Sequence, residues 1–271
     1  MNCSTHHGTC ARTVAKALLF LETMSSRELT FTEKESPRDL VSAADMAVHK
    51  LMCEQLEPTR IPVVSEENAA SHALATQPMP QCWMLDPIDG TTNFATRIPL
   101  YGVSLALMDG TSFTVGSFGM PATRELFYTV SPDASYLNDA RLRPIRKTLT
   151  TSLVGGCFSS RARSTQQSRN DEFRLFGIIN DRSRGCLRLG SAGVSICYTA
   201  AGKLGATYGI AGKVWDVAAA LAIARAAGCR ILIAATPDPL AMSYVVGHGD
   251  VVGEIHAIVR DELRITSWKE G

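Results

Sequence analysis

Two carboxylates stand three residues apart in a segment that follows an apolar stretch, Asp86-Pro87-Ile88-Asp89-Gly90-Thr91-Thr92-Asn93-Phe94. Because Pro87 stiffens the chain, such a turn can point both carboxylates and a carbonyl oxygen between them at one position. These hard oxygens are ligands that suit Mg²⁺. Gly90 lets the backbone approach a ligand closely, and free amides at the start of a helix bind phosphate oxygens. The segment therefore predicts the cation and anion contacts that a metal-assisted phosphatase requires. For the two aspartates alone, a surface turn before a helix cap is an equally good interpretation.

Three other segments place acidic residues next to predicted elements. Ser65-Glu66-Glu67 follows a β-branched strand, Trp215-Asp216-Val217 opens a helix, and the segment from Lys34 to Asp45 leads into a helix. Taken singly, these have ordinary interpretations as a solvated acid pair, an N-terminal cap and a connecting loop. The four acidic segments taken together are far more specific than any one of them.

The elements that must position these residues follow from apolar periodicity and turn signals. Helical spacing predicts helices over about residues 9–25, from Ser42 to Pro58, and from Trp215 onwards. Short apolar runs predict strands at 61–64, 83–85 and 126–130, and a hairpin joins 103–108 to 113–118. After these elements, strands and helices are predicted to alternate over 153–157, 171–180 and 191–201, and a final helix is predicted near 253–263.

The mixture of both element types in both halves of the chain predicts an α/β fold with layered sheets and helices. A polar, basic segment at 138–147 is the best candidate for a boundary, although a solvated connector has the same composition. We therefore expect an N-terminal half at 1–140, which carries most of the acidic residues, and a C-terminal half at 141–271.

Composition excludes several classes of protein. The chain has 271 residues with 27 Lys and Arg against 26 Asp and Glu, a net charge of +1, so nucleic acid is not expected as a main partner. No apolar run is long enough to span a membrane, and no secretory signal is recognised, so a cytoplasmic protein is expected. The 8 cysteines and 6 histidines form no metal-binding pattern, which predicts reduced thiols and oxygen ligands for any metal. We also expect no histidine or cysteine beside the motifs, which counts against a covalent phospho-enzyme.

Together, the four acidic segments resemble the inositol monophosphatase family of Mg²⁺-dependent phosphatases. The resemblance covers the chain from about Lys34 to Ile255, and the DPIDGTTNF segment matches the central motif of the family closely. It implies the alternating α-β-α-β-α sandwich of the inositol monophosphatase and fructose-1,6-bisphosphatase type. It also implies a homodimer and inhibition by lithium, which would compete at a Mg²⁺ site.

The resemblance implies a role for particular residues. Two or three Mg²⁺ ions would be bound by acidic side chains and one carbonyl, those of Glu66, Asp86, Asp89, Asp216 and Ile88. The implied catalytic residues are Thr91, Asp45 and Glu66, because Thr91 matches the threonine that, with the aspartate matched by Asp45, helps to activate the attacking water. The implied substrate-binding residues are Gly90, Thr91, Asp89, Gly190, Ser191, Ala192 and Asp216. Lys34 stands where the family often has a lysine near the metals.

Two departures from the family pattern concern the substrate. Gly209 replaces the glutamate that usually contacts inositol hydroxyls, and Ser65 replaces a glycine, as in relatives that act on phosphoadenosine or sugar bisphosphates. We expect a Mg²⁺-dependent phosphomonoesterase that hydrolyses a small phosphorylated polyol, with inositol monophosphate as the first candidate. The alternatives are 3′-phosphoadenosine 5′-phosphate, fructose 1,6-bisphosphate or histidinol phosphate as substrate, and a non-catalytic metal- or phosphate-binding protein.

Overall fold

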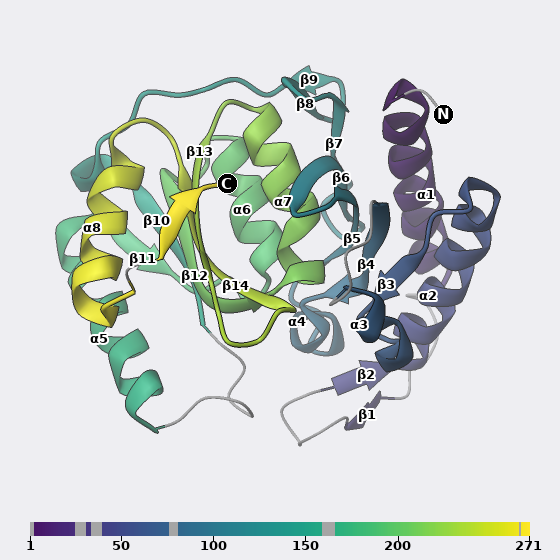
Figure 1. The fold of residues 1–271 in the computed structure, drawn as a ribbon, viewed down its shortest axis with the longest axis horizontal. Coiled ribbons are helices and arrows are strands. Elements are labelled where there is room, and N and C mark those ends of the chain that lie inside the picture. Colours follow the sequence, from purple (N-terminus) through teal and green to yellow (C-terminus); the bar gives the residue numbers. More distant parts are fainter. Residues whose placement is uncertain (1–2, 25–30, 34–39, 76–80, 159–165, 266) are drawn as a thin grey trace.

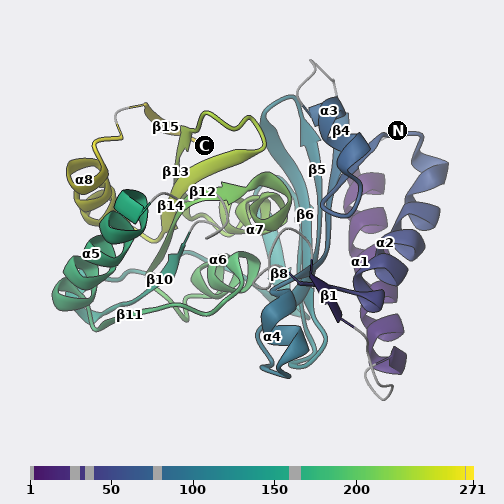
Figure 2. The same cartoon turned by 90° about the horizontal axis from the view of Figure 1, so that it is seen from below.

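Helices and sheets alternate in layers across the molecule, as Figures 1 and 2 show. The computed structural model describes residues 3–24, 31–33, 40–75, 81–158, 166–265 and 267–271. The layers are a helix pair, a seven-stranded sheet, a second helix pair, a six-stranded sheet and a third helix pair. The predicted α-β-α-β-α sandwich is therefore confirmed.

The seven-stranded sheet carries the DPIDGTTNF segment. Its strands lie in the order β3 (Val63–Ser65), β4 (Gln81–Asp89), β5 (Gly102–Asp109), β6 (Ser112–Met120), β7 (Glu125–Ser131), β8 (Ala134–Leu137) and β9 (Ala140–Arg141). β3 pairs parallel with β4, and the other neighbours are antiparallel. Helices α1 (Cys3–Met24) and α2 (Ala43–Leu56) cover its outer face with buried apolar side chains.

The six-stranded sheet lies on the other side of the central helices. Its order is β11 (Gly185–Leu187), β10 (Leu153–Cys157), β12 (Ala206–Lys213), β14 (Ala241–Gly247), β13 (Arg230–Ala235) and β15 (Trp268–Glu270). Helices α5 (Gln166–Arg182) and α8 (Val251–Leu263) cover its outer face. The remaining short elements are β1 (Phe31–Glu33), β2 (Leu40–Ser42), α3 (Ala69–Ala75), α4 (Thr91–Ala95) and the 3₁₀ turns Glu57–Thr59 and Leu149–Thr151.

The central helices α6 (Ala192–Ala200) and α7 (Val214–Ala226) are buried between the two sheets. Seven consecutive residues of α7, Ala218 to Ala224, are at most 3% exposed, and small side chains let the helix lie close to its neighbours. A Cβ at Gly116 of β6 would lie 2.3 Å from the Ala219 carbonyl oxygen, so that contact requires glycine. This close packing holds α7 against the larger sheet.

Two predicted elements differ from the structure in a way that affects the site. The strand predicted at 83–85 continues through Asp89, with an irregularity in its pairing to β5 between Asp86 and Asp89. The helix predicted to open at Trp215 begins at Val214 with Lys213 at its N-cap, so Asp216 lies in the first turn and is not the cap. Strands β12 and β13 and helix α3 were not predicted.

The basic segment at 138–147 contains β9 and leads from the larger sheet towards the smaller one. The division of the chain at residues 140 and 141 stays a prediction. Within the part of the chain that the structure describes, no helix has both the length and the apolar character that crossing a membrane requires.

Candidate active site

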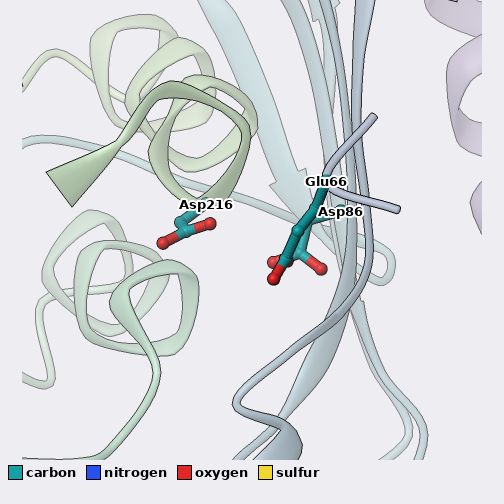
Figure 3. A group of neighbouring side chains, drawn as sticks. All are labelled: Glu66, Asp86 and Asp216. Atoms are coloured by element: carbon teal, nitrogen blue, oxygen red, sulfur yellow. The ribbon is translucent and has the colours of Figure 1, made fainter. Parts of the chain in front are cut away.

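Three carboxylates from three separate elements converge between the larger sheet and α7. Glu66 directly follows β3, Asp86 lies in β4 and Asp216 lies in the first turn of α7. The parallel pairing of β3 with β4 places Glu66 beside Asp86, since the Glu66 amide donates to the Leu85 carbonyl at 3.1 Å. One carboxylate oxygen of each residue lies within 4.8 Å of the other two. Figure 3 shows Asp216 reaching from α7 towards the other two side chains. We call Glu66, Asp86 and Asp216 the acidic group.

The electrostatics of the acidic group suit a bound cation. Asp86 is only 2% exposed, and burial raises its pKa well above the ordinary range. The charges of Glu66, Asp216, Asp89 and Asp45 raise that pKa further. Carboxylates this close repel one another unless a proton or a cation lies between them. Hard oxygen ligands at this spacing fit Mg²⁺, so the residues present are compatible with the metal that the sequence predicts.

Asp89 points towards α6 and lies outside the acidic group. Its Oδ2 atom accepts hydrogen bonds from Ser191 Oγ at 2.5 Å and from the Gly193 amide at 2.6 Å. Burial raises the pKa of Asp89 to about 6, although the bonds from Ser191 and Gly193 oppose that rise. Ser191 is also the N-cap of α6, because its hydroxyl accepts from the Val194 amide. Asp89 therefore joins β4 to the start of α6, and its role as a metal ligand stays a prediction.

The turn after Asp86 holds the predicted carbonyl ligand and the predicted catalytic threonine together. The Ile88 amide donates to Asp86 Oδ1 at 3.0 Å, and Thr91 Oγ1 donates to the Ile88 carbonyl at 3.0 Å. Gly90 is the N-cap of α4 with φ +93°, a conformation that glycine adopts without strain. A Cβ there would also lie 3.2 Å from the Leu100 carbonyl oxygen. This geometry leaves a second lone pair on the Ile88 oxygen for a cation.

Asp45 lies in the first turn of α2 and is 1% exposed. Its charge contributes to the raised pKa of Asp86, which places it within electrostatic range of the acidic group. Its predicted cooperation with Thr91 stays a prediction. Lys34, which the sequence places near the metals, lies outside the described residues.

The predicted substrate loop, Gly190-Ser191-Ala192, lies directly beside the DPIDGTTNF segment. Asn93 Nδ2 donates to the Leu100 carbonyl at 2.7 Å and to the Leu189 carbonyl at 2.8 Å. A Cβ at Gly190 would meet the Asn93 amide at 2.7 Å, and Gly190 has φ +84°. Sequence reasoning gave Asn93 no role beyond a helix cap. The position of Asn93 within the DPIDGTTNF motif was a signal in the sequence. Its partner Leu189, however, is distant in the sequence.

The expectation that no histidine or cysteine lies beside the motifs is wrong in three dimensions. His49 Nδ1 lies 2.8 Å from Ser65 Oγ, and His72 Nε2 lies 2.9 Å from the Ser65 carbonyl oxygen. Cys157 lies near Asp89, and burial raises its pKa to about 11. A thiol with that pKa is protonated at neutral pH and is a poor nucleophile. Neither histidine replaces the acidic group as the centre of the site.

The packing around Gly209 explains why a glycine stands where the family usually has a glutamate. A Cβ at this position of β12 would lie 2.4 Å from the ring of Tyr244, which is fully buried on β14. The Tyr244 hydroxyl makes no hydrogen bond of ordinary geometry among the described residues. Tyr244 thus occupies the space that a side chain at residue 209 would need, and a glutamate could not fit there without displacing it.

Gly209→Ala should destabilise the protein by about 1–3 kcal/mol, because the added methyl group overpacks against Tyr244. Denaturant unfolding measures this change. In a Tyr244→Ala background the same substitution should cost less, since the clash is gone. Gly253→Ala in α8 is the control, because the added Cβ would lie 3.9 Å from its nearest neighbour, the Arg230 side chain. Equal costs of Gly209→Ala in both backgrounds would contradict this interpretation.

Comparisons with known proteins agree with the fold and identify the family. The sequence profile of the inositol monophosphatase family matches residues 7–264. The inositol-1-monophosphatase of Mycobacterium bovis is 32% identical over 208 residues, which are 74% of this chain and 70% of the relative. The Nus factor SuhB of Pasteurella multocida is 31% identical, with 73% of each chain covered. The SuhB structure from Mycobacterium tuberculosis superposes with a TM-score of 0.77 at 26% identity, covering 95% of this chain and 96% of the other.

The chain belongs to the inositol monophosphatase family. It is a phosphatase, that is, a phosphoric monoester hydrolase, of a metal-dependent family. The fold also matches a staphylococcal inositol monophosphatase-1 in a LiCl-soaked inhibitory complex, with a TM-score of 0.82 at 17% identity over 99% of this chain and 98% of the other.

Proposed function

We propose that the protein catalyses the Mg²⁺-dependent hydrolysis of the phosphate monoester of a small polyol, with inositol monophosphate as the first candidate substrate. The observation that carries this proposal is the acidic group, whose three carboxylates lie within 4.8 Å of one another. Carboxylates that converge at this spacing, one of them buried, repel one another, and a bound cation offsets that repulsion.

The residues around the acidic group have complementary tasks in this proposal. Glu66, Asp86 and Asp216 would hold Mg²⁺, with Asp89 and the Ile88 carbonyl completing the ligands of two or three ions. When bound, Mg²⁺ lowers the pKa of the attacking water and neutralises charge on the phosphoryl group. The amides of Gly90 and Thr91 would orient the phosphate. Thr91 and Asp45 would accept the proton of the attacking water, since a threonine hydroxyl alone is too weak a base.

The substrate beyond the phosphate is less constrained by the site. A structure of a Staphylococcus aureus relative, SaIMPase-II, contains bound inositol monophosphate. In this chain Tyr244 fills the space beside Gly209, so no carboxylate at that position can bind inositol hydroxyls. This observation favours a second group of candidates, namely 3′-phosphoadenosine 5′-phosphate, fructose 1,6-bisphosphate and histidinol phosphate. In each case Gly190, Ser191 and Ala192 would contact the part of the substrate that is not phosphate.

The values of kcat/KM for phosphate release from these compounds, measured with Mg²⁺, test the choice of substrate. The proposal expects one compound to be preferred by about tenfold or more, the discrimination that contacts to a substrate group provide. Inositol 1-phosphate as the best substrate would show that other residues recognise its hydroxyls. No release from any compound would contradict the proposal.

The family resemblance adds a homodimer, a cytoplasmic location and lithium inhibition to the proposal. Light scattering coupled to size-exclusion chromatography tests the dimer, and a monomer would contradict it. Titration with LiCl at limiting Mg²⁺ tests the inhibition, which should weaken as Mg²⁺ is raised if the two ions compete.

Mg²⁺ should stabilise the protein more at about pH 8 than at about pH 5. The pKa of Asp89 is raised from 3.8 to about 6, and that of Asp86 is raised well above 3.8. Groups with raised folded pKa values stabilise the fold at low pH, and this contribution is lost as the pH rises through the folded pKa. The metal-free protein therefore loses stability as the pH rises from about 5 to about 8. Over the same range, deprotonation frees the carboxylate oxygens of Asp86 and Asp89 for a cation.

Thermal unfolding with and without Mg²⁺ at both pH values measures this effect, with choline chloride at equal ionic strength as the control. An equal shift of Tm at the two pH values would show that the cation does not bind to these carboxylates.

A further inference from the structure

One imidazole contacts the residues that directly precede two members of the acidic group. His72 lies in α3, the short helix that follows Glu66 in the chain. Its Nε2 atom is 2.9 Å from the carbonyl oxygen of Ser65, the residue before Glu66. Its ring stacks on Trp215, the residue before Asp216, with centroids 4.7 Å apart and planes at 21°. His72 therefore links the edge of the larger sheet to the first turn of α7.

Ser65 and Trp215, the two residues that His72 contacts, each make further contacts of their own. Ser65 is fully buried; its amide donates to Ser71 Oγ at 3.1 Å, and its hydroxyl contacts His49. These contacts position the β3 side. The carbonyl of Trp215 accepts from Ser104 Oγ at 3.1 Å, which positions the α7 side against β5. The imidazole of His72 contacts both sides at once.

The carboxylates need such a link because they repel one another before a cation binds. Glu66 extends from a strand of three residues at the edge of its sheet, and Asp216 extends from a helix in the next layer. Spreading of the two layers would relieve the repulsion and would also separate the ligands. A hydrogen bond to a buried carbonyl and a ring stacked on a largely buried tryptophan both resist this separation.

We propose that His72 is a positioning residue for the cation site, which holds Glu66 and Asp216 at the separation that a single Mg²⁺ ion requires. Since a carbonyl oxygen only accepts, His72 Nε2 donates its hydrogen to Ser65, and the ring stacks on Trp215. The inference rests on the proposed function, because it assumes that the acidic group binds a cation. His72 does not touch the carboxylates, so its effect is on the arrangement of the ligands before binding.

Two substitutions separate the contacts of His72. His72→Phe keeps a flat ring for Trp215 but loses the hydrogen bond, and His72→Gln keeps a hydrogen-bond donor but loses the stacked ring. His72→Ala loses both. His256→Phe is the matched control, because His256 also packs on a tryptophan, Trp268, with centroids 5.1 Å apart, but on α8 and β15.

Calorimetric titration of the metal-free proteins with Mg²⁺ measures the effect without relying on turnover. The Kd for Mg²⁺ should rise about 10- to 100-fold in His72→Ala, the loss typical of removing a residue that orients metal ligands. His72→Phe and His72→Gln should each show part of that loss, and His256→Phe should bind like the unaltered protein. With saturating Mg²⁺, kcat should return to within a few-fold of the original value, because only the ligand arrangement has changed.

The outcomes distinguish the two claims. If the unaltered protein binds Mg²⁺ and all His72 variants bind it equally well, His72 has no positioning role and the inference is wrong. If the unaltered protein does not bind Mg²⁺, the proposed function fails and this inference fails with it. A loss of kcat in His72→Phe and His72→Gln that saturating Mg²⁺ does not restore would also overturn the positioning role.

Discussion

Asp86→Asn should reduce Mg²⁺-dependent phosphate release by about a thousandfold, because several kcal/mol of transition-state stabilisation depend on the bound metal. Asparagine has nearly the same shape, and its carbonyl oxygen can still accept the hydrogen bond that the Ile88 amide gives to Asp86. The acidic group loses one charge and one anionic ligand. Steady-state kinetics at several Mg²⁺ concentrations measure the effect.

The stability of the same variant separates a lost ligand from a lost fold. Because burial and neighbouring charges raise the pKa of Asp86, its charged form destabilises the metal-free protein at neutral pH. The metal-free Asp86→Asn protein should therefore be at least as stable to denaturant as the unaltered protein. Asp109→Asn, at the exposed end of β5, removes a charge elsewhere and should leave activity unchanged. Activity of Asp86→Asn within tenfold of the unaltered protein would contradict the site assignment.

Gly193→Ala should have the second large effect, on both stability and turnover. A Cβ at this position of α6 would lie 2.1 Å from the Phe118 ring and 2.7 Å from Asp89 Oδ2. Both neighbours are buried, so one must move. We expect a loss of about 3 kcal/mol in the free energy of unfolding from overpacking. Displacement of Asp89 should also lower kcat/KM by about a hundredfold, since small misplacements of active-site groups have effects of this size.

Gly177→Ala is the matched control for that substitution. Gly177 lies within α5, and a Cβ there would meet no atom within 4 Å. Alanine should stabilise the helix by about 0.5–1 kcal/mol and leave turnover unchanged. Denaturant unfolding and the phosphatase assay on both variants test the comparison. If Gly193→Ala is as stable and as active as Gly177→Ala, then α6 and Asp89 are not packed as described.

The sequence predicted the site best where its residues are contiguous. Asp86, Ile88, Asp89, Gly90 and Thr91 belong to one motif whose turn, glycine and helix start are readable locally. Glu66 and Asp216 had ordinary local interpretations, and only the family resemblance joined them to the motif. The parallel pairing of β3 with β4 and the close packing of α7 are what bring them together.

Features that depend on contacts between distant segments could not be predicted. The link from His72 to Trp215 joins α3, which was not predicted, to α7. The bond from Asn93 to Leu189 joins residues that are 96 positions apart in the sequence. β12 contains two glycines, Gly209 and Gly212, within Ala206–Lys213, so it lacks the alternation typical of a strand. β13 is a short apolar run, which periodicity alone does not distinguish from a buried helix. These contacts form only once both sheets are in place.

Phosphate release from inositol 1-phosphate and the other candidate substrates, before and after removal of metal with EDTA, tests the central claim most directly. We expect release with Mg²⁺, loss of release with EDTA, and recovery when Mg²⁺ is added back in excess to the unaltered protein but not to Asp86→Asn. Release that persists in EDTA after prolonged dialysis, or recovery of Asp86→Asn to the original rate, would contradict a catalytic cation at Glu66, Asp86 and Asp216.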